Sequence, residues 1–194
     1  MLLNKFLFII FFLSTSFTIL WTQSYERLKS IYNDYSLELS LLDSNKIIEE
    51  EENLVLWGHD IYKRKIFISH RSRPYLFSLD SAAKSNDITL LIISGYRSYL
   101  KQAQIINNKL ESGKPLSQIL KENELPGYSQ HHTGSAIDIC TENDNTLAIN
   151  FQYSREYKWL IKNAHLYNYY LSYSDTTTSN INFEPWHWYY KEKN

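Results

Sequence analysis

Two short segments of this chain hold the residue types that bind divalent metal ions. The first contains His131, His132 and Asp138 around a glycine turn, and the second contains Glu184 three residues before His187. Two imidazoles and one carboxylate suit a catalytic zinc ion, which takes three protein ligands and keeps one position open for water. Zinc lowers the pKa of that water, so the fourth residue, Glu184, is a candidate general base. Each signal alone is also typical of structural histidines and solvent-facing aspartates, so spacing by itself does not establish that a metal site is present.

Other reactive or aromatic residues lie near these segments. Trp186, Trp188 and Tyr190 surround His187 in the sequence and are expected to wall the site and limit water. The single cysteine, Cys140, ends an apolar stretch and has no partner for an internal disulfide. We expect a buried structural thiol there and not a nucleophile.

The elements that must position these residues alternate irregularly between strand and helix patterns. Strands are predicted at 54–57, 65–69, 88–93, 135–140, 169–173 and 186–190, and helices from Pro74 to about residue 84, at 99–110 and at 153–165. The strand at 88–93 delivers Arg97 to a sheet edge. This order predicts an α+β fold, a single domain with a central, largely antiparallel sheet flanked by helices and the metal site at the sheet edge.

Composition and the N-terminal sequence restrict the class of protein and its division into segments. The net charge of -1 gives no basic excess of the kind that nucleic-acid binding requires. Lys5 precedes the apolar stretches 6–13 and 17–21, so residues 1–22 are predicted to be a signal peptide or a membrane anchor. Residues 23–53 are expected to be helical and polar and to end in the acidic run 49–52, a solvated face or linker. Residues 54–194 are expected to form the catalytic domain.

The two metal-binding segments belong to a set of four separated motifs. They are Ser94-Gly95-Tyr96-Arg97-Ser98-Tyr99 with Gln102, Pro126-Gly127-Tyr128-Ser129-x-His131-x-x-Gly134-x-Ala136-x-Asp138, Trp159-Leu160 with Asn163-Ala164, and Glu184-Pro185-Trp186-His187. In this order the chain resembles the VanY-type D-alanyl-D-alanine carboxypeptidases, a family that includes D-Ala-D-Ala dipeptidases and L,D-carboxypeptidases. The resemblance extends from about Pro74 to Tyr190. Agreement of several motifs in both order and distance makes it specific.

The resemblance implies roles for the metal-binding segments. It implies that His131, Asp138 and His187 bind Zn²⁺ and that Glu184 is the catalytic base. The family register selects His131 as the ligand, and we place His132 at the rim of the site.

The resemblance also implies roles for substrate-binding residues. Arg97 is expected to stabilise the oxyanion of the tetrahedral intermediate or to hold a substrate carboxylate. Ser129 and Gln102 resemble positions that line the substrate site. From residue type alone, Ser129 could instead cap a turn, and Gln102 could lie on a solvated helix face.

Two positions depart from the family pattern. Family members commonly carry Glu where Gln130 stands and Arg where Tyr189 stands. A charge lost near the site could change which peptide terminus is preferred.

The sequence therefore predicts a zinc metallopeptidase that removes the C-terminal D-amino acid from peptidoglycan stem peptides. We expect an exported monomer, periplasmic or at the cell surface, that is anchored to the membrane if its N-terminal segment is not cleaved. The alternatives are an L,D-carboxypeptidase or wall endopeptidase on the same scaffold, and a non-catalytic zinc-stabilised module that binds the wall.

Overall fold

The computed structural model describes residues 22–142, 147–174 and 180–192. The apolar stretches 6–13 and 17–21, predicted to form a signal peptide or anchor, lie outside these residues. Within the described ranges, no helix is both long enough and apolar enough to span a bilayer.

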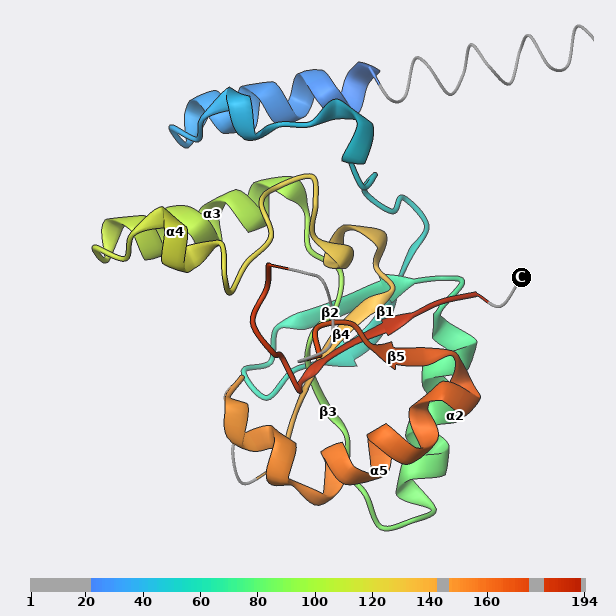
Figure 1. The fold of residues 1–194 in the computed structure, drawn as a ribbon. Coiled ribbons are helices and arrows are strands. Elements are labelled where there is room, and N and C mark those ends of the chain that lie inside the picture. Colours follow the sequence, from blue (N-terminus) through green and yellow to red (C-terminus); the bar gives the residue numbers. More distant parts are fainter. Residues whose placement is uncertain (1–21, 143–146, 175–179, 193–194) are drawn as a thin grey trace, which may run out of the picture.

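Strands and helices follow one another irregularly along the described chain (Figure 1). A helix over residues 22–34 and two 3-10 turns, Leu39–Leu41 and Ser44–Lys46, come before the first strand. The strands are β1 (Leu54–His59), β2 (Lys65–Ser69), β3 (Leu91–Ser94), β4 (Ala136–Cys140), β5 (Tyr169–Leu171) and β6 (His187–Tyr190). The helices are α2 (Arg73–Lys84), α3 (Tyr99–Glu111), α4 (Leu116–Ile119) and α5 (Arg155–Asn163), with 3-10 turns η3 (Gln130–Thr133), η4 (Ile149–Tyr153) and η5 (Ala164–Tyr167).

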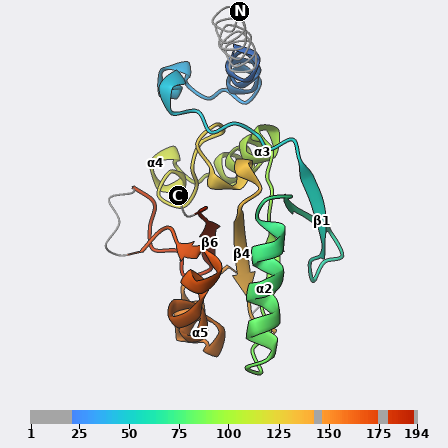
Figure 2. The ribbon, with the colours of Figure 1, turned by 90° about the vertical axis from the view of Figure 1, so that its right-hand side faces the viewer.

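The strands form two antiparallel groups. β1 and β2 make a hairpin, and the other four strands form a sheet in the order β3-β4-β6-β5. Leu76 and Leu79 of α2 and Leu160 of α5 share one buried core with Ile137 and Ile139 of β4. Figure 2 shows α2 and α5 next to β4 and β6. The predicted α+β architecture with a largely antiparallel sheet is therefore confirmed.

Local signals explain where two helices begin. The Ser98 hydroxyl accepts a hydrogen bond from the backbone N–H of Lys101, and Ser154 does the same for Tyr157. Each cap satisfies one of the free N–H groups in the first turn of its helix. Because Ser154 has extended backbone, the helix predicted at 153–165 is divided, and α5 begins only at Arg155.

The third strand is shorter than the sequence predicts. Ile88 and Leu90 are buried, as expected from the apolar run 88–93, but the strand itself begins at Leu91. Both residues belong to the core cluster without being part of the strand. The apolar run 88–93 therefore predicts which residues are buried, but only its last part pairs with β4.

The N-terminal region packs on α3 in a second core. Leu28 and Tyr32 of the first helix are fully buried against a cluster that includes Ala103 and Ile106. The phenol of Tyr32 also donates to the backbone oxygen of Pro126 at 3.0 Å. The region is therefore joined to the rest of the chain by an apolar contact.

The acidic run departs from the expectation of a solvated face or linker at one residue. The carboxylate of Glu50, whose side chain is only 13% exposed, pairs with Arg27. It also accepts a hydrogen bond from the backbone N–H of Tyr99. Tyr99 begins α3, where a negative charge satisfies free N–H groups and the helix dipole. Glu50 therefore holds the N-terminal region to the start of the helix that follows Arg97.

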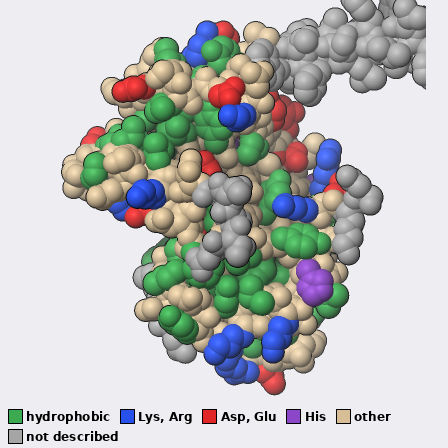
Figure 3. Space-filling model, in the orientation of Figure 1, with side chains coloured by type: hydrophobic (Ala, Val, Ile, Leu, Met, Phe, Trp, Pro, Cys, Tyr) green, Lys and Arg blue, Asp and Glu red, His purple; other side chains and the backbone are tan. Residues whose placement is uncertain are grey.

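The surface carries charges of both signs. On the face drawn in Figure 3, basic and acidic side chains are both spread over the molecule. Hydrophobic side chains lie around the centre of that face.

Candidate metal centre and active site

The centre of the site is formed by two neighbouring strands. Asp138 on β4 lies directly opposite His187 on β6 in the antiparallel register. Residues that face each other across such a pair project their side chains on the same side of the sheet. The Oδ1 atom of Asp138 therefore lies 3.0 Å from Nδ1 of His187, although the two residues are 49 positions apart.

The third donor comes from the 3-10 turn before β4. Gly134 ends this turn in the left-handed conformation, with φ of 64°, and a side chain there would collide with the backbone nitrogen of Ser69. The chain can therefore fold tightly back after His131. As a result, Nε2 of His131 lies 3.2 Å from Oδ2 of Asp138.

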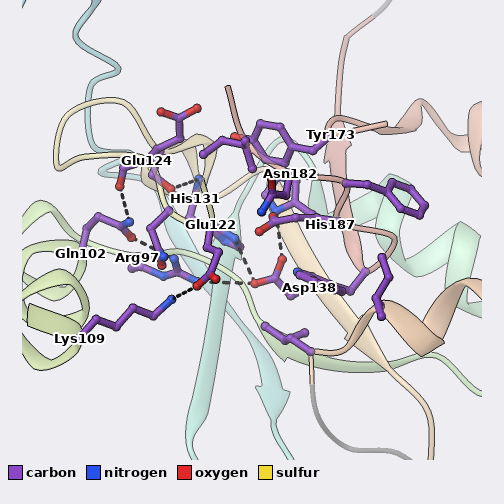
Figure 4. Close-up of a pocket in the computed structure, with 18 residues that line it drawn as sticks. Arg97, Gln102, Lys109, Glu122, Glu124, His131, Asp138, Tyr173, Asn182 and His187 are labelled. Carbon is purple, nitrogen blue, oxygen red and sulfur yellow. Dashed lines mark hydrogen bonds and ion pairs between the residues drawn. The ribbon is translucent and has the colours of Figure 1, made fainter. Parts of the chain in front are cut away.

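The donor set fits a tetrahedral metal ion. One donor atom from each of His131, Asp138 and His187 lies within 4.8 Å of the others, and all three residues are buried. Two ligands that are each about 2.1 Å from a tetrahedral ion are roughly 3.4 Å apart, close to the separations of 3.0 and 3.2 Å seen here. These are the three ligands predicted from the sequence, and the structure brings them together (Figure 4).

Hydrogen bonding orients the first imidazole. The Nδ1 atom of His131 lies 2.6 Å from the backbone oxygen of Gly95. Because a carbonyl can only accept, Nδ1 carries the proton and Nε2 keeps the lone pair that faces Asp138. A metal requires this neutral form, and burial lowers the pKa of His131 to about 4.

Asp138 stays ionised although it is fully enclosed. Burial alone would raise its pKa, but the neighbouring imidazoles of His131 and His187 outweigh this effect and hold the pKa well below the usual range. The guanidinium of Arg97 lies 3.5 Å from its Oδ2 atom and adds positive charge. The centre therefore offers one carboxylate donor and two imidazole donors.

Arg97 is fixed by a network at the edge of the sheet. Gly95 lets this loop approach β2, where the N–H of Tyr96 donates to the backbone oxygen of Phe67 at 2.7 Å. The guanidinium donates to Oε1 of Gln102 at 2.9 Å and to Oγ of Ser94 at 3.1 Å. Arg97 is thus held beside the three donors, as predicted from its place after the third strand.

The two predicted substrate-binding residues both line the cavity, and both also make structural hydrogen bonds. Gln102 is buried on α3, where its amide accepts from Arg97 and donates to the backbone oxygen of Glu124. It therefore does not lie on a solvated helix face. The Ser129 hydroxyl accepts from the N–H of His131 and caps the 3-10 turn.

The donors open into a cavity of about 500 Å³ with two kinds of wall. One wall is polar and includes Arg97, Gln102, Lys109 and Glu122. The apolar part of the lining is formed mainly by Leu147, Ile149, Ile181, Phe183 and Trp186. Tyr173 also lines the cavity, with its ring 4.9 Å from that of His187. Sequence reasoning missed Lys109, Glu122 and Tyr173, because no local motif connects them with the ligands.

Two of the three aromatic residues expected to wall the site lie elsewhere. Trp186 lines the cavity, but Trp188 and Tyr190 belong to the hydrophobic core. The reason is the alternation of side chains along a strand. Because His187 points toward Asp138, Trp188 and Tyr190 must project from the other face of β6.

His132 is not at the rim of the site. It is fully buried, its Nδ1 lies 2.6 Å from the backbone oxygen of Arg97, and its Nε2 accepts from the N–H of Gly127. Burial lowers its pKa to about 4, so the neutral ring bridges two loops. His132 therefore helps to hold the backbone of Arg97. The expected buried thiol is confirmed, since Cys140 has no exposed surface.

Glu184 lies in the same cavity, in the loop before β6. Its backbone N–H donates to the oxygen of Tyr173, and its backbone oxygen accepts from the N–H of His187. Burial raises the pKa of Glu184 to about 8, the charge of Asp138 acts in the same direction, and Arg97 opposes both. In the metal-free protein the carboxyl group is therefore mostly protonated at neutral pH.

The raised pKa of Glu184 predicts a pH-dependent stability of the metal-free protein. An unfolded glutamate has a pKa of about 4.3, so the protonated form favours folding, and this stabilisation is lost as pH rises through 8. Between pH 5 and 8 we expect the free energy of unfolding to fall by several kcal/mol, at most roughly 1.4 kcal/mol per pKa unit, relative to Glu184→Gln. Urea unfolding of both proteins with a chelator measures this difference. A difference that does not change with pH would contradict the buried carboxyl.

Comparison with curated proteins places this site in a family. A family model described as VanY, D-alanyl-D-alanine carboxypeptidase, matches residues 65–193. The D-alanyl-D-alanine carboxypeptidase of Enterococcus faecalis is 31% identical over 133 residues, which make up 63% of this chain and 48% of that protein. The chain spans about half the length of the curated relatives it matches.

Solved structures share the same fold. The LdcB LD-carboxypeptidase aligns with a TM-score of 0.65 and 28% identity over 73% of this chain and 69% of its own. VanYB, solved in complex with D-alanine-D-alanine, aligns with a TM-score of 0.61 and 25% identity over 79% of this chain and 87% of its own. Because one family model covers most of the chain and spans every residue of the site described above, the protein belongs to the VanY family of D-alanyl-D-alanine carboxypeptidases.

Proposed function

We propose that this protein is a zinc-dependent carboxypeptidase that removes the terminal D-alanine from peptidoglycan stem peptides. The observation that carries the proposal is the convergence of three buried donors, Glu184 and Arg97 on one cavity. The likeness to VanYB, which was solved with D-alanine-D-alanine, supports the substrate class. We further propose that the enzyme works outside the cytoplasm, because its substrate is there and residues 1–22 have the pattern of an export signal.

His131, Asp138 and His187 are the proposed ligands. When bound, zinc would supply Lewis-acid activation of water and of the scissile carbonyl. Glu184 accepts the proton of the attacking water and returns it to the leaving amine. Positive charge between the three donors favours the ionised form of Glu184, so its raised pKa describes the metal-free protein. The apolar wall at Trp186 and Phe183 limits the access of bulk water.

Arg97 is proposed to act on the reacting carbonyl. If the guanidinium stabilises the oxyanion, Arg97→Lys should lower kcat by roughly a hundredfold with little change in KM, because lysine keeps the charge but loses the forked donors that Gln102 and Ser94 orient. If it holds the ground-state carboxylate, KM should rise while kcat stays constant. Steady-state kinetics on a stem pentapeptide distinguish the two roles. Arg155→Lys, an exposed position on α5, is the matched control, and equal kinetics in both variants would exclude Arg97 from the reaction.

The main alternative is an L,D-carboxypeptidase. It is favoured by the likeness to LdcB, an LD-carboxypeptidase, which aligns with a TM-score of 0.65. In that case the bond cut would follow an L-centre and the substrate would be a tetrapeptide.

Product masses from defined peptides test the proposed function. Purified full-length protein with zinc is incubated separately with muramyl pentapeptide, muramyl tetrapeptide and intact sacculi, with Glu184→Gln as the inactive control. Loss of one alanine from the pentapeptide supports the D,D-activity, and loss from the tetrapeptide supports the L,D-activity. Fragments released from sacculi without either product would indicate an endopeptidase. A zinc-loaded protein that binds these peptides and cuts none would indicate a binding module.

A further inference from the structure

The second imidazole of the centre is contacted by a side chain outside the cavity. The Oε1 atom of Gln130 lies 3.0 Å from Nε2 of His187. The hydroxyl of Ser172 donates to the same oxygen at 2.7 Å. Gln130 is not among the described residues that line the cavity. It therefore contacts the His187 ring from outside the cavity.

The contact determines which nitrogen of His187 can bind a metal. An amide oxygen can only accept, so Nε2 of His187 must carry the proton. An imidazole that binds a metal is neutral and has one proton, so its lone pair is then on Nδ1, which lies 3.0 Å from Oδ1 of Asp138. If the amide were turned by 180°, its NH₂ group would face Nε2 and the proton would move to Nδ1. A proton at Nδ1 occupies the position that a metal needs.

The two imidazoles of the centre are thus oriented in different ways. His131 is held by the backbone oxygen of Gly95, which no substitution can remove. His187 is held by a side chain, and it uses the opposite ring nitrogen. Among the described residues, the outer hydrogen bond thus comes from the backbone at His131 and from a replaceable side chain at His187.

We propose that Gln130 is a positioning residue that holds the proton on Nε2 of His187 and so keeps Nδ1 available to the metal. The proposal rests on the metal site of the proposed function. It also explains how glutamine can replace the glutamate that family members commonly carry at this position. Glutamine supplies the same oxygen acceptor as glutamate but has no charge. Gln130 then acts on the metal centre and not on the choice of peptide terminus.

Metal affinity and nitrogen chemical shifts of full-length variants test this role. The variants are Gln130→Met, which keeps the size and removes the acceptor, Gln130→Glu, which keeps the acceptor, and Gln118→Met at an exposed position of α4 as control. Zinc affinity is measured by competition with a chelator. Long-range ¹H–¹⁵N spectra of the zinc-loaded proteins show which nitrogen of His187 carries the proton, and circular dichroism shows that each variant is folded.

We expect Gln130→Met to weaken zinc binding by roughly 10- to 100-fold, because loss of an outer hydrogen bond to a ligand has effects of this size. Gln130→Glu should bind zinc at least as tightly as the wild type and keep the proton on Nε2, and Gln118→Met should match the wild type. Unchanged zinc affinity in Gln130→Met would overturn the inference. If Gln130→Met does not fold, a tenfold loss of affinity in Gln130→Glu would overturn it equally. A wild-type protein that binds no zinc, or binds it without His187, would instead reject the metal site itself.

Discussion

Replacing Glu184 by glutamine is expected to lower kcat by roughly a thousandfold or more while the protein still binds one equivalent of zinc. Transfer of a proton by a positioned carboxylate contributes factors of roughly 10² to 10⁴, and glutamine keeps the size of the side chain but cannot accept the proton. Zinc binding should persist, because the three donors are on other residues. Turnover of a stem peptide and metal content of the same sample measure the two effects.

Another carboxyl group of the cavity provides a comparison for this experiment. Burial also raises the pKa of Glu124, which lines the cavity from the α4 side. Unlike Glu184, it has no backbone hydrogen bond to the N–H of His187. We expect Glu124→Gln to lower kcat by less than about tenfold, below the roughly 10² to 10⁴ that a proton-transferring carboxylate contributes. A larger effect in Glu124→Gln than in Glu184→Gln would assign the base to Glu124. Loss of zinc in Glu184→Gln would show that Glu184 is itself a ligand.

Replacing Asp138 by asparagine is expected to remove both the metal and the activity. The carboxylate is the only anionic donor of the three, and it lies within 3.0 to 3.5 Å of His187, His131 and Arg97. Without it, the positive charge of Arg97 stays buried without its partner. Breaking a buried ion pair on one side typically costs about 3 to 5 kcal/mol, and we expect the lower end because Gln102 and Ser94 still accept from Arg97.

Zinc content after dialysis and urea unfolding of the metal-free protein measure these two effects. Asp80→Asn is the matched control, because Asp80 forms an i,i+4 pair with the exposed Lys84 on α2. Such pairs stabilise by about 0.3 to 0.5 kcal/mol. Normal zinc content in Asp138→Asn would exclude the carboxylate as a ligand. Equal stability of the two variants would show that Arg97 does not depend on Asp138.

Local patterns predicted much of the fold. The starts of α3 and β2 and the helix beginning near Pro74 follow from periodicity, capping residues and turn residues, because these act between neighbours in the sequence. The same holds for the turn at Gly134, where only glycine takes the left-handed conformation easily. The resemblance to the family motifs also pointed to the residues of the centre, since the family register distinguished His131 from His132.

The contacts that build the site were decided by tertiary structure. The register of β4 against β6 places Asp138 opposite His187, and a shift by one residue would point His187 toward the core instead of Trp188. The alternation within each strand fixes which side chains face the core, but it does not specify which residue of β6 pairs with Asp138. The hydrogen bond of Gln130 to His187, the support of Arg97 by Gln102 and the capping of α3 by Glu50 likewise join residues that local periodicity does not relate. Such contacts form only when separate elements pack together, so sequence motifs could name the candidate ligands but could not show what holds each of them in place.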